Sequence, residues 1–199
     1  MVEALSRWQE RWNRAMPRGD RIDRGRLESM VVDPASELAN LLPDATAYRA
    51  WLSERCAFVG AEGIPAAARH NDLTMWNVLL DEGGSIGVLD WAEAEPAGLP
   101  LTDFFYAVAD AAAACEGYGS RIEAVRSCFA PGGARAQGVA ALERRLSAPL
   151  GLTPAATQLC FHACWLRHAL NEQRAGAASD RPFLDIVRWQ ARRALEAAA

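Results

Sequence analysis

Residues 69–91 of this 199-residue chain are RHNDLTMWNVLLDEGGSIGVLDW, and this stretch decides the fold. Residues 77–81 and 86–90 are short β-type runs, and the turn-forming sequence EGGS at residues 82–85 separates them, so a β-hairpin is predicted. A hairpin brings its two ends together. We therefore expect Asn77, which opens the first run, to lie near Asp90, which closes the second. Asp72 lies on the loop just before them.

Two carboxylates and one amide at the end of a hairpin suit phosphoryl transfer. Mg²⁺ prefers hard oxygen ligands and commonly takes one or two carboxylates, with phosphate oxygens and water completing its shell. The reaction needs little beyond an oriented hydroxyl and neutralised phosphate charge. The simpler interpretation is that Asp72 and Asn77 only form turns and caps, a common use of Asp and Asn. A metal-dependent hydrolase using the same carboxylates is a further alternative.

The order of these motifs resembles a known family. The run H-x-D-x-x-x-x-N at residues 70–77, the hairpin, Asp90-Trp91 and the run G-x-P-x-x-D at residues 98–103 are similar to the catalytic loop and metal segment of aminoglycoside phosphotransferases and related small-molecule kinases. Protein kinases share this core. The resemblance covers residues 69–103 closely. Two positions depart from the family pattern: Asn71 stands where Gly is usual, and Met75 where Pro is common.

The resemblance implies a role for each polar residue. Asp72 would accept or orient the proton of the substrate hydroxyl, while Asn77 and Asp90 would bind Mg²⁺. His70 would support the loop structurally, and Asp103 would hydrogen-bond the loop from beneath. Leu79 would form part of the floor under the adenine ring of ATP. The implied cofactors are ATP and Mg²⁺, and the implied substrate is a small-molecule hydroxyl.

The rest of the chain is predicted to be helical. Val2, Leu5, Trp8, Trp12 and Met16 recur every three or four residues, which is one apolar helix face. A turn at residues 17–20 ends that helix. Further helices are expected at residues 21–32, 33–42 (with Asp33 as cap and Pro34 in the first turn), 102–114, 121–128, 134–146, 153–174 and 182–199, and another is lined by Tyr48, Trp51, Leu52 and Cys56. The prediction is a mainly α chain with one small β-hairpin (α+β), a single domain over residues 1–199, organised as the C-terminal lobe of a protein-kinase-like fold.

The N-terminal lobe of such a kinase has no counterpart in the sequence before the loop. That lobe supplies a glycine-rich loop over the phosphates and a strand lysine. The residues before residue 69 are expected to be helices, and all 21 basic residues are Arg, so the chain holds no lysine. Arg and Lys are not equivalent at such a site. We expect the lobe to come from a separate chain, a dimer partner or a longer gene product, or the protein to work without it.

Composition excludes several classes of protein. The net charge of −4 gives no indication of a nucleic-acid partner. The first residues lack the apolar core of a signal peptide, and the apolar run at residues 104–115 is too short to cross a bilayer, so no membrane partner is expected. Five cysteines without disulfide-scaffold spacing favour a reduced, cytoplasmic protein.

Three further patterns have both a functional and a structural interpretation. Cys160, Cys164 and His168 share a helix face, but three positions four residues apart span roughly 12 Å, too far for one zinc ion. Buried packing is the commoner use of such cysteines. Glu93, Glu95 and Glu116 suggest an acidic patch for a cationic substrate, although a solvated surface is the simpler interpretation. Trp76 and Trp91 flank the predicted site and either line it or pack beside it.

Two functions from different classes therefore remain. One is a phosphotransferase domain that moves the γ-phosphate of ATP to a small-molecule hydroxyl and is incomplete without an N-lobe. The alternative is a non-catalytic kinase-like binding module. The complete set Asp72, Asn77 and Asp90 favours the first, and the missing lysine and N-lobe favour the second.

Overall fold

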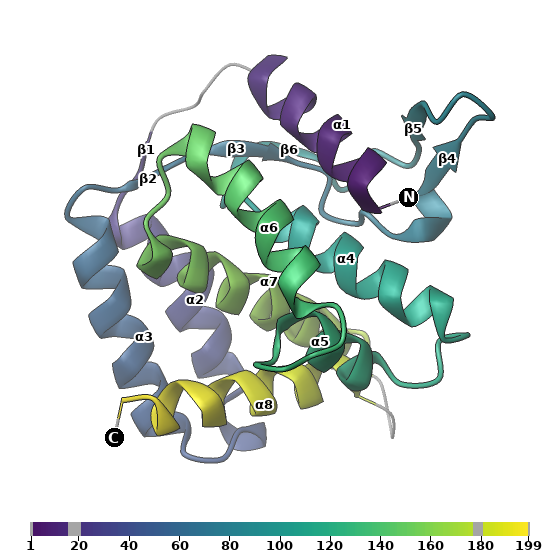
Figure 1. Ribbon diagram of the computed structural model, residues 1–199. Helices are drawn as coiled ribbons and strands as arrows, with labels where there is room; N and C mark the ends of the chain where they lie inside the picture. The colour runs from purple at the N-terminus through teal and green to yellow at the C-terminus, as the bar shows by residue number, and fades with distance from the viewer. Residues whose placement is uncertain (1, 16–20, 177–180, 199) are drawn as a thin grey trace. The chain divides into compact units, whose positions relative to one another are not determined.

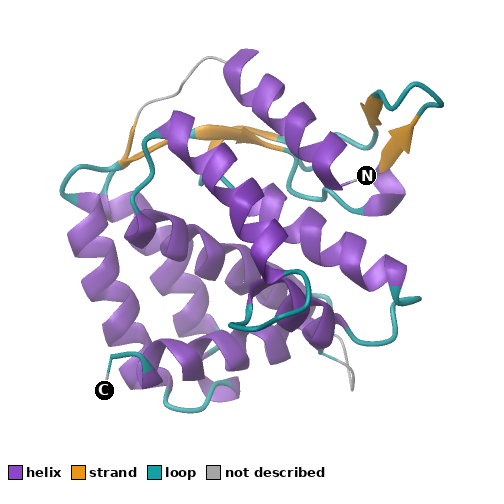
Figure 2. Ribbon diagram, in the orientation of Figure 1, coloured by secondary structure: helices purple, strands orange, loops and turns teal. Residues whose placement is uncertain are grey.

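The computed structural model describes residues 2–15, 21–176 and 181–198. The turn expected at residues 17–20 lies outside these ranges. Contacts divide the chain into two compact units, unit 1 with residues 1–20 and 65–153, and unit 2 with residues 21–64 and 154–199. Each unit is mostly helical, with short two-stranded sheets (Figures 1 and 2). The α+β class is thereby confirmed, and a single domain over residues 1–199 stays a prediction.

Unit 2 is a group of four helices packed on one another. Its largest fully buried side chains include Tyr48, Leu52 and Trp165. The short strand β1 (Arg21–Ile22) precedes the first of these helices and pairs with β2 (Ile64–Pro65). The helices and the 3-10 turn of unit 2 are α2 (Arg24–Glu37), η1 (Ala39–Leu41), α3 (Ala45–Gly60), α7 (Pro154–Arg174) and α8 (Pro182–Glu196).

Helix α2 differs from the sequence prediction, which placed separate helices at residues 21–32 and 33–42. One helix begins after Asp23, whose side chain accepts a hydrogen bond from the backbone of Arg26, and continues through Pro34 to Glu37. Pro34 lies in the last turn of the helix. It lacks a backbone N–H and so removes one hydrogen bond, close to the end where the last carbonyl groups have no partner within the helix. The buried Leu27, Val31 and Ala35 form one face across the proline, and packing of that face keeps the helix continuous.

Unit 1 contains residues 69–91, with the loop and the predicted hairpin. Helix α4 is the most buried of its described helices, with every residue from Thr102 to Ala113 buried. Helix α1 contacts both α4 and α6, and α4 packs on α5. The elements of unit 1 are α1 (Val2–Ala15), β3 (Ala67–Arg69), η2 (Met75–Asn77), β4 (Val78–Leu80), β5 (Ile86–Val88), β6 (Glu95–Gly98), α4 (Thr102–Cys115), α5 (Arg121–Phe129), α6 (Ala136–Ser147) and η3 (Ala148–Leu150).

The predicted hairpin is present as the antiparallel pair β4–β5, with Leu79 opposite Gly87. The turn between the strands is closed by Asp81, whose carboxylate accepts from the backbone of Ser85 at 2.7 Å, and by Gly84, whose φ of +80° only glycine adopts readily. Strands β3 and β6 form a second antiparallel pair, which the sequence analysis did not predict. This pair brings residue 69, which precedes the loop at residues 70–77, beside residue 95, in the segment that leads into α4.

No described helix is long and apolar enough to cross a membrane.

Candidate active site

The loop at residues 70–77 is held from below by Asp103 in the first turn of α4. The Asp103 carboxylate accepts two backbone hydrogen bonds, from the amide of His70 at 2.6 Å and from the amide of Asn71 at 2.8 Å. Asp103 is buried, which raises the pKa of its carboxyl, while the two amide donors and nearby Arg69 act in the opposite direction. The contact expected from the sequence, with Asp103 hydrogen-bonding the loop from beneath, is present.

Asn71 adopts a backbone conformation that most residues avoid. Its φ is +72°, in the left-handed region. Gly reaches this region without strain, and Asn tolerates it better than other residues with a Cβ. Its side chain also donates a hydrogen bond to the carbonyl of Glu93 at 2.7 Å. The departure from Gly at this position therefore preserves the shape of the loop.

His70 is fully buried, and it joins the loop to the residues that follow the second strand of the hairpin. Its Nε2 lies 2.8 Å from the carbonyl oxygen of Leu89, which can only accept, so Nε2 carries the proton. The other ring nitrogen, Nδ1, is then the acceptor for the backbone amide of Asp72, at 3.4 Å. The ring meets the edge of Trp91 with centroids 4.9 Å apart. These contacts of His70 hold the loop and the hairpin together, and its supporting role in the site stays a prediction.

Asp72 and Asn77 contact each other directly. The side-chain nitrogen of Asn77 donates to the Asp72 carbonyl at 2.9 Å and to the Asp72 carboxylate at 3.0 Å. Partial burial raises the pKa of Asp72, and the charges of Asp90 and Asp110 raise it further, against the hydrogen bond from Asn77. A raised pKa makes a carboxylate a better proton acceptor when it is ionised.

Asp90 lies at the end of the hairpin beside Asn77. The backbone amide of Leu89 donates to the carbonyl of Asn77 at 2.9 Å, which fixes the strand ends together. Asp90 is exposed, has a positive φ of 56°, and is close enough for its charge to act on Asp72. The hairpin therefore gathers Asp72, Asn77 and Asp90 as expected. Carboxylate and amide oxygens with an exposed side fit a Mg²⁺ ion that takes its other ligands from phosphate and water.

Asp110 is a site residue that the sequence analysis missed. Its fully buried carboxylate accepts from the backbone amide of Met75 at 2.7 Å and pairs with Arg121 at 3.1 Å. Tyr118 also reaches it, with its hydroxyl 3.4 Å away. Asp103 and Asp110 are seven residues apart, two helical turns, and so lie on the same face of α4. One carboxylate holds the start of the loop, and the other holds its end.

The available sequence signal for Asp110 was a charge inside an otherwise apolar run at residues 104–115. A charged side chain in a buried helix face needs a partner, because an unpaired buried charge is strongly unfavourable. The cost of burying a charge could have indicated that Asp110 has a partner, but not that the partners are the Met75 amide of the loop and Arg121.

A comparison with known families supports this site. The model of the phosphotransferase enzyme family matches residues 4–138, which is more than half of the chain and includes the whole loop and hairpin. This chain belongs to the phosphotransferase enzyme family. No curated protein and no solved structure matched.

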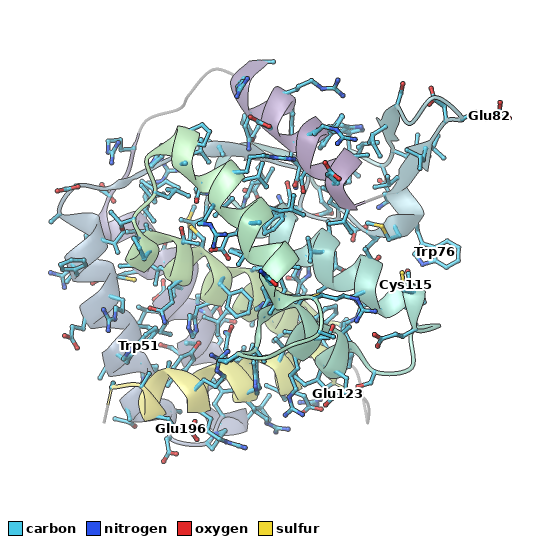
Figure 3. All side chains as sticks on the ribbon, in the orientation of Figure 1. Trp51, Trp76, Glu82, Cys115, Glu123 and Glu196 are labelled. Atoms are coloured by element: carbon cyan, nitrogen blue, oxygen red, sulfur yellow. The ribbon has the colours of Figure 1, made fainter. Side chains whose placement is uncertain are left out.

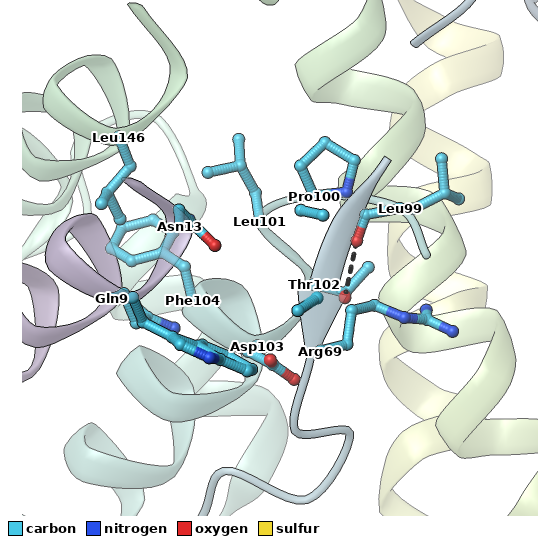
Figure 4. A pocket seen from close by; sticks show the side chains of 13 residues that line it. Gln9, Asn13, Arg69, Leu99, Pro100, Leu101, Thr102, Asp103, Phe104 and Leu146 are labelled. Atoms are coloured by element: carbon cyan, nitrogen blue, oxygen red, sulfur yellow. Dashed lines mark hydrogen bonds between the residues drawn. The ribbon is translucent and has the colours of Figure 1, made fainter. Parts of the chain in front are cut away.

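Gly98, the glycine of the G-x-P-x-x-D run, is approached closely by a side chain. A Cβ at Gly98 would clash with the guanidinium group of Arg69, so any other residue here would displace the arginine. The buried Arg69 side chain crosses this position and pairs with Glu95. Figure 4 shows Arg69 beside Leu99, Thr102 and Asp103, where the chain turns into α4. The hydroxyl of Thr102 donates to the Leu99 carbonyl at 3.1 Å and closes this turn.

The hairpin and the turn before it expose several large apolar side chains. Leu79 is 54% exposed and Leu80 is 46% exposed, so neither belongs to the core. Trp76 is 79% exposed, and its ring projects away from the ribbon (Figure 3). Trp91 instead packs on Trp12 of α1 at 5.4 Å. Of the two tryptophans expected to flank the site, Trp91 takes part in packing and Trp76 faces solvent.

The two remaining sequence patterns are explained by packing and ion pairs. Cys160 and Cys164 are buried in α7, and His168 stacks on Phe183 at 5.2 Å. Within the described part of the chain, no three His, Cys, Asp or Glu side chains are grouped as a metal site. Glu95 pairs with Arg69 and Glu116 pairs with Arg135, so arginines offset two of the three charges of the suggested acidic patch.

Proposed function

We propose that this phosphotransferase moves the γ-phosphate of ATP to the hydroxyl of a small molecule. The observation that carries the proposal is the grouping of Asp72, Asn77 and Asp90 at one hairpin end, on a loop held by buried Asp103. Phosphoryl transfer depends mainly on position and charge neutralisation, and this loop is fixed by hydrogen bonds at both of its ends.

In the proposed reaction, the substrate hydroxyl oxygen attacks the γ-phosphorus while its proton passes to the Asp72 carboxylate. A new P–O bond forms, the bond from the γ-phosphorus to the β,γ-bridging oxygen breaks, and ADP leaves. Asn77 and Asp90 would hold Mg²⁺, which neutralises phosphate charge when it is bound. Leu79, exposed on β4, would lie under the adenine ring.

A second candidate is a kinase-like module that binds without turnover. The described residues before the loop form α1, α2, α3 and the short strands β1, β2 and β3, and the sequence contains no lysine. No described element before the loop therefore resembles a glycine-rich sheet over the phosphates. We propose that such an element comes from a separate N-lobe chain or a dimer partner, and that the exposed Leu79 and Leu80 lie under it.

Calorimetric titration with Mg·ATP tests the proposal. We expect the wild-type chain to bind Mg·ATP and the Asp90→Ala variant to lose at least tenfold in affinity. Glu82→Ala is the matched control, because Glu82 is an exposed carboxylate at the far tip of the same hairpin (Figure 3). Its affinity should equal that of the wild type.

Asp72→Asn separates catalysis from binding. It should bind Mg·ATP but form no phosphate ester, because Asn cannot accept the hydroxyl proton. Absence of Mg·ATP binding in a wild-type protein shown to be folded would contradict a phosphotransferase function of this chain alone and would favour the non-catalytic module.

A further inference from the structure

An apolar groove lies beside the catalytic loop in unit 1. It has a volume of about 940 Å³, within the range of small-molecule sites. Its walls come from the start of α1, from α4 and α5, and from α6 with the residues just before it. The side chains that make it apolar include Val108, Ala111, Ala112, Val139, Leu142 and Met75.

Met75 connects this groove to the predicted chemistry. It lies three residues after Asp72 on the same loop, and its backbone amide is held by Asp110. Asp110 in turn sits on α4 between the groove residues Val108 and Ala111, and its charge acts on Asp72. The wall of the groove and the carboxylate expected to take the hydroxyl proton therefore belong to one loop, which Asp110 holds at Met75.

The charges around the groove do not suit a polycation. Only Glu3 and Arg135 among its lining residues carry charge. Glu3 pairs with Arg7 at 2.8 Å, and Arg135 pairs with Glu116 at 2.8 Å. A polycationic amino sugar would need several carboxylates that are not already paired, whereas an apolar body gains free energy from the area that it removes from water.

We propose that this groove binds the apolar body of the acceptor, so that the substrate of this phosphotransferase is an uncharged, largely apolar alcohol. The inference rests on the proposed function and names its substrate class. The alcohol oxygen forms the new bond to the γ-phosphorus, its proton goes to Asp72, and ADP leaves with the electron pair of the broken bond.

Gly138 provides a variant that fills the groove without disturbing the core. It lines the groove on α6, and a Cβ at this position would meet no heavy atom within 4 Å outside its own stretch of helix. Gly138→Trp should therefore fold and obstruct the groove. Arg144→Trp is the matched control, because Arg144 is exposed on the same helix and does not line the groove.

The experiment titrates protein labelled with ¹³C at the methionine methyl groups with 1-decanol and borneol as apolar alcohols and with kanamycin as a polycation. Met75 lines the groove, and Met30 in unit 2 is the internal control. We expect the alcohols to shift the Met75 signal and not the Met30 signal. Gly138→Trp should weaken this binding at least tenfold, Arg144→Trp less than twofold, and kanamycin should leave Met75 unchanged.

Two outcomes would overturn the inference: no response of Met75 to either alcohol, or full alcohol affinity in folded Gly138→Trp. Ester formation is followed by the mass of the phosphorylated alcohol, with Asp72→Asn as the inactive control. The Mg·ATP titration is separate. Loss of nucleotide binding contradicts the proposed function, whereas nucleotide binding with a silent Met75 contradicts only the apolar acceptor.

Discussion

At the scale of single residues, the loop at residues 70–77 contains one unusual backbone angle. Asn71 has a φ of +72° and donates a side-chain hydrogen bond to the Glu93 carbonyl. A residue with a Cβ pays roughly 1–2 kcal/mol in this left-handed region, and Asn pays less because its short polar side chain bonds locally. Glycine at this position would be unstrained, but it would lack the side-chain hydrogen bond to the Glu93 carbonyl.

We therefore predict that Asn71→Ala lowers the free energy of unfolding by about 1–2 kcal/mol, and that Asn71→Gly stays within about 1 kcal/mol of the wild type. Urea denaturation of the three proteins measures the difference. Equal stability of the Ala and Gly variants would show that the angle does not limit this position.

At the scale of elements, α4 is the helix on which the loop rests. Its two buried carboxylates accept backbone hydrogen bonds from both ends of the loop, Asp103 from His70 and Asp110 from Met75. Because the acceptors are on one helix face, α4 determines the distance between the two ends of the loop. Besides His70, the loop contributes one fully buried side chain, Leu73, which packs with Leu5 and Ala107.

Asp110→Asn tests this dependence. Removing the charge weakens two buried contacts of Asp110, its ion pair with Arg121 and its hydrogen bond from the Met75 amide, so we predict a loss of about 1.5–3 kcal/mol in the free energy of unfolding. The charge of Asp110 raises the pKa of Asp72. In a plot of the rate of the proposed phosphate-ester formation against pH, the variant should therefore shift the acidic limb to lower pH. Glu123→Gln on α5, whose exposed carboxylate pairs with Arg126, is the control and should change stability by less than about 0.5 kcal/mol.

Unit 2 contains a buried polar contact between its helices. His162 of α7 accepts at Nδ1 from the Tyr48 hydroxyl of α3 at 2.7 Å, since that hydroxyl already receives a hydrogen bond from Gln190 of α8 at 3.1 Å. Desolvation lowers the pKa of His162 from 6.5 to about 3, with a smaller contribution from the charge of Arg193. The ring is therefore neutral in the folded protein at neutral pH.

A histidine with a lowered pKa binds fewer protons folded than unfolded. Its contribution to stability is complete above pH 6.5 and is lost as the pH falls toward about 3. We predict that the free energy of unfolding falls in this window with a slope of up to about 1.4 kcal/mol per pH unit from this group. Urea denaturation between pH 7 and pH 4 measures it, and His162→Gln should remove that part of the slope. An unchanged slope in the variant would assign the acid sensitivity to other groups.

At the scale of the whole molecule, burial sorts the five cysteines. Cys56, Cys128, Cys160 and Cys164 are buried and Cys115 is exposed, and all five are free thiols. Cys115 also lines the apolar groove. The fold therefore makes one thiol accessible and places it where an acceptor is proposed to bind.

We predict that a thiol reagent modifies one cysteine rapidly in the folded protein and all five after denaturation, with mass spectrometry placing the rapid reaction at Cys115. Bound 1-decanol should slow that reaction at least several-fold. A second rapid thiol would mean that part of the core is more open than the structure indicates. Cys115→Ser should abolish the rapid reaction, which separates Cys115 from the buried Cys128 of the same groove.

The sequence by itself determined the hairpin, most of the helices, the grouping of Asp72, Asn77 and Asp90, and the resemblance that the family comparison confirmed. It could do so because these features depend on neighbours along the chain: strand composition, turn residues and helical periodicity. The sequence prediction was wrong at Pro34 for the same reason: it placed a break between two helices there, whereas α2 continues through the proline. A local rule stops helices at proline, whereas burial of Val31 and Ala35 on one face decided the outcome.

Only the tertiary structure decided which residues hold the loop and what surrounds it. Asp110 became a site residue because α4 places it 2.7 Å from the Met75 amide, 35 positions away in the chain. The β3–β6 pair, the Arg69 side chain over Gly98 and the groove at Gly138 likewise join segments far apart in sequence. Periodicity and propensity describe how a segment presents its side chains, but the partner that satisfies a buried charge is set by packing, which no local pattern records.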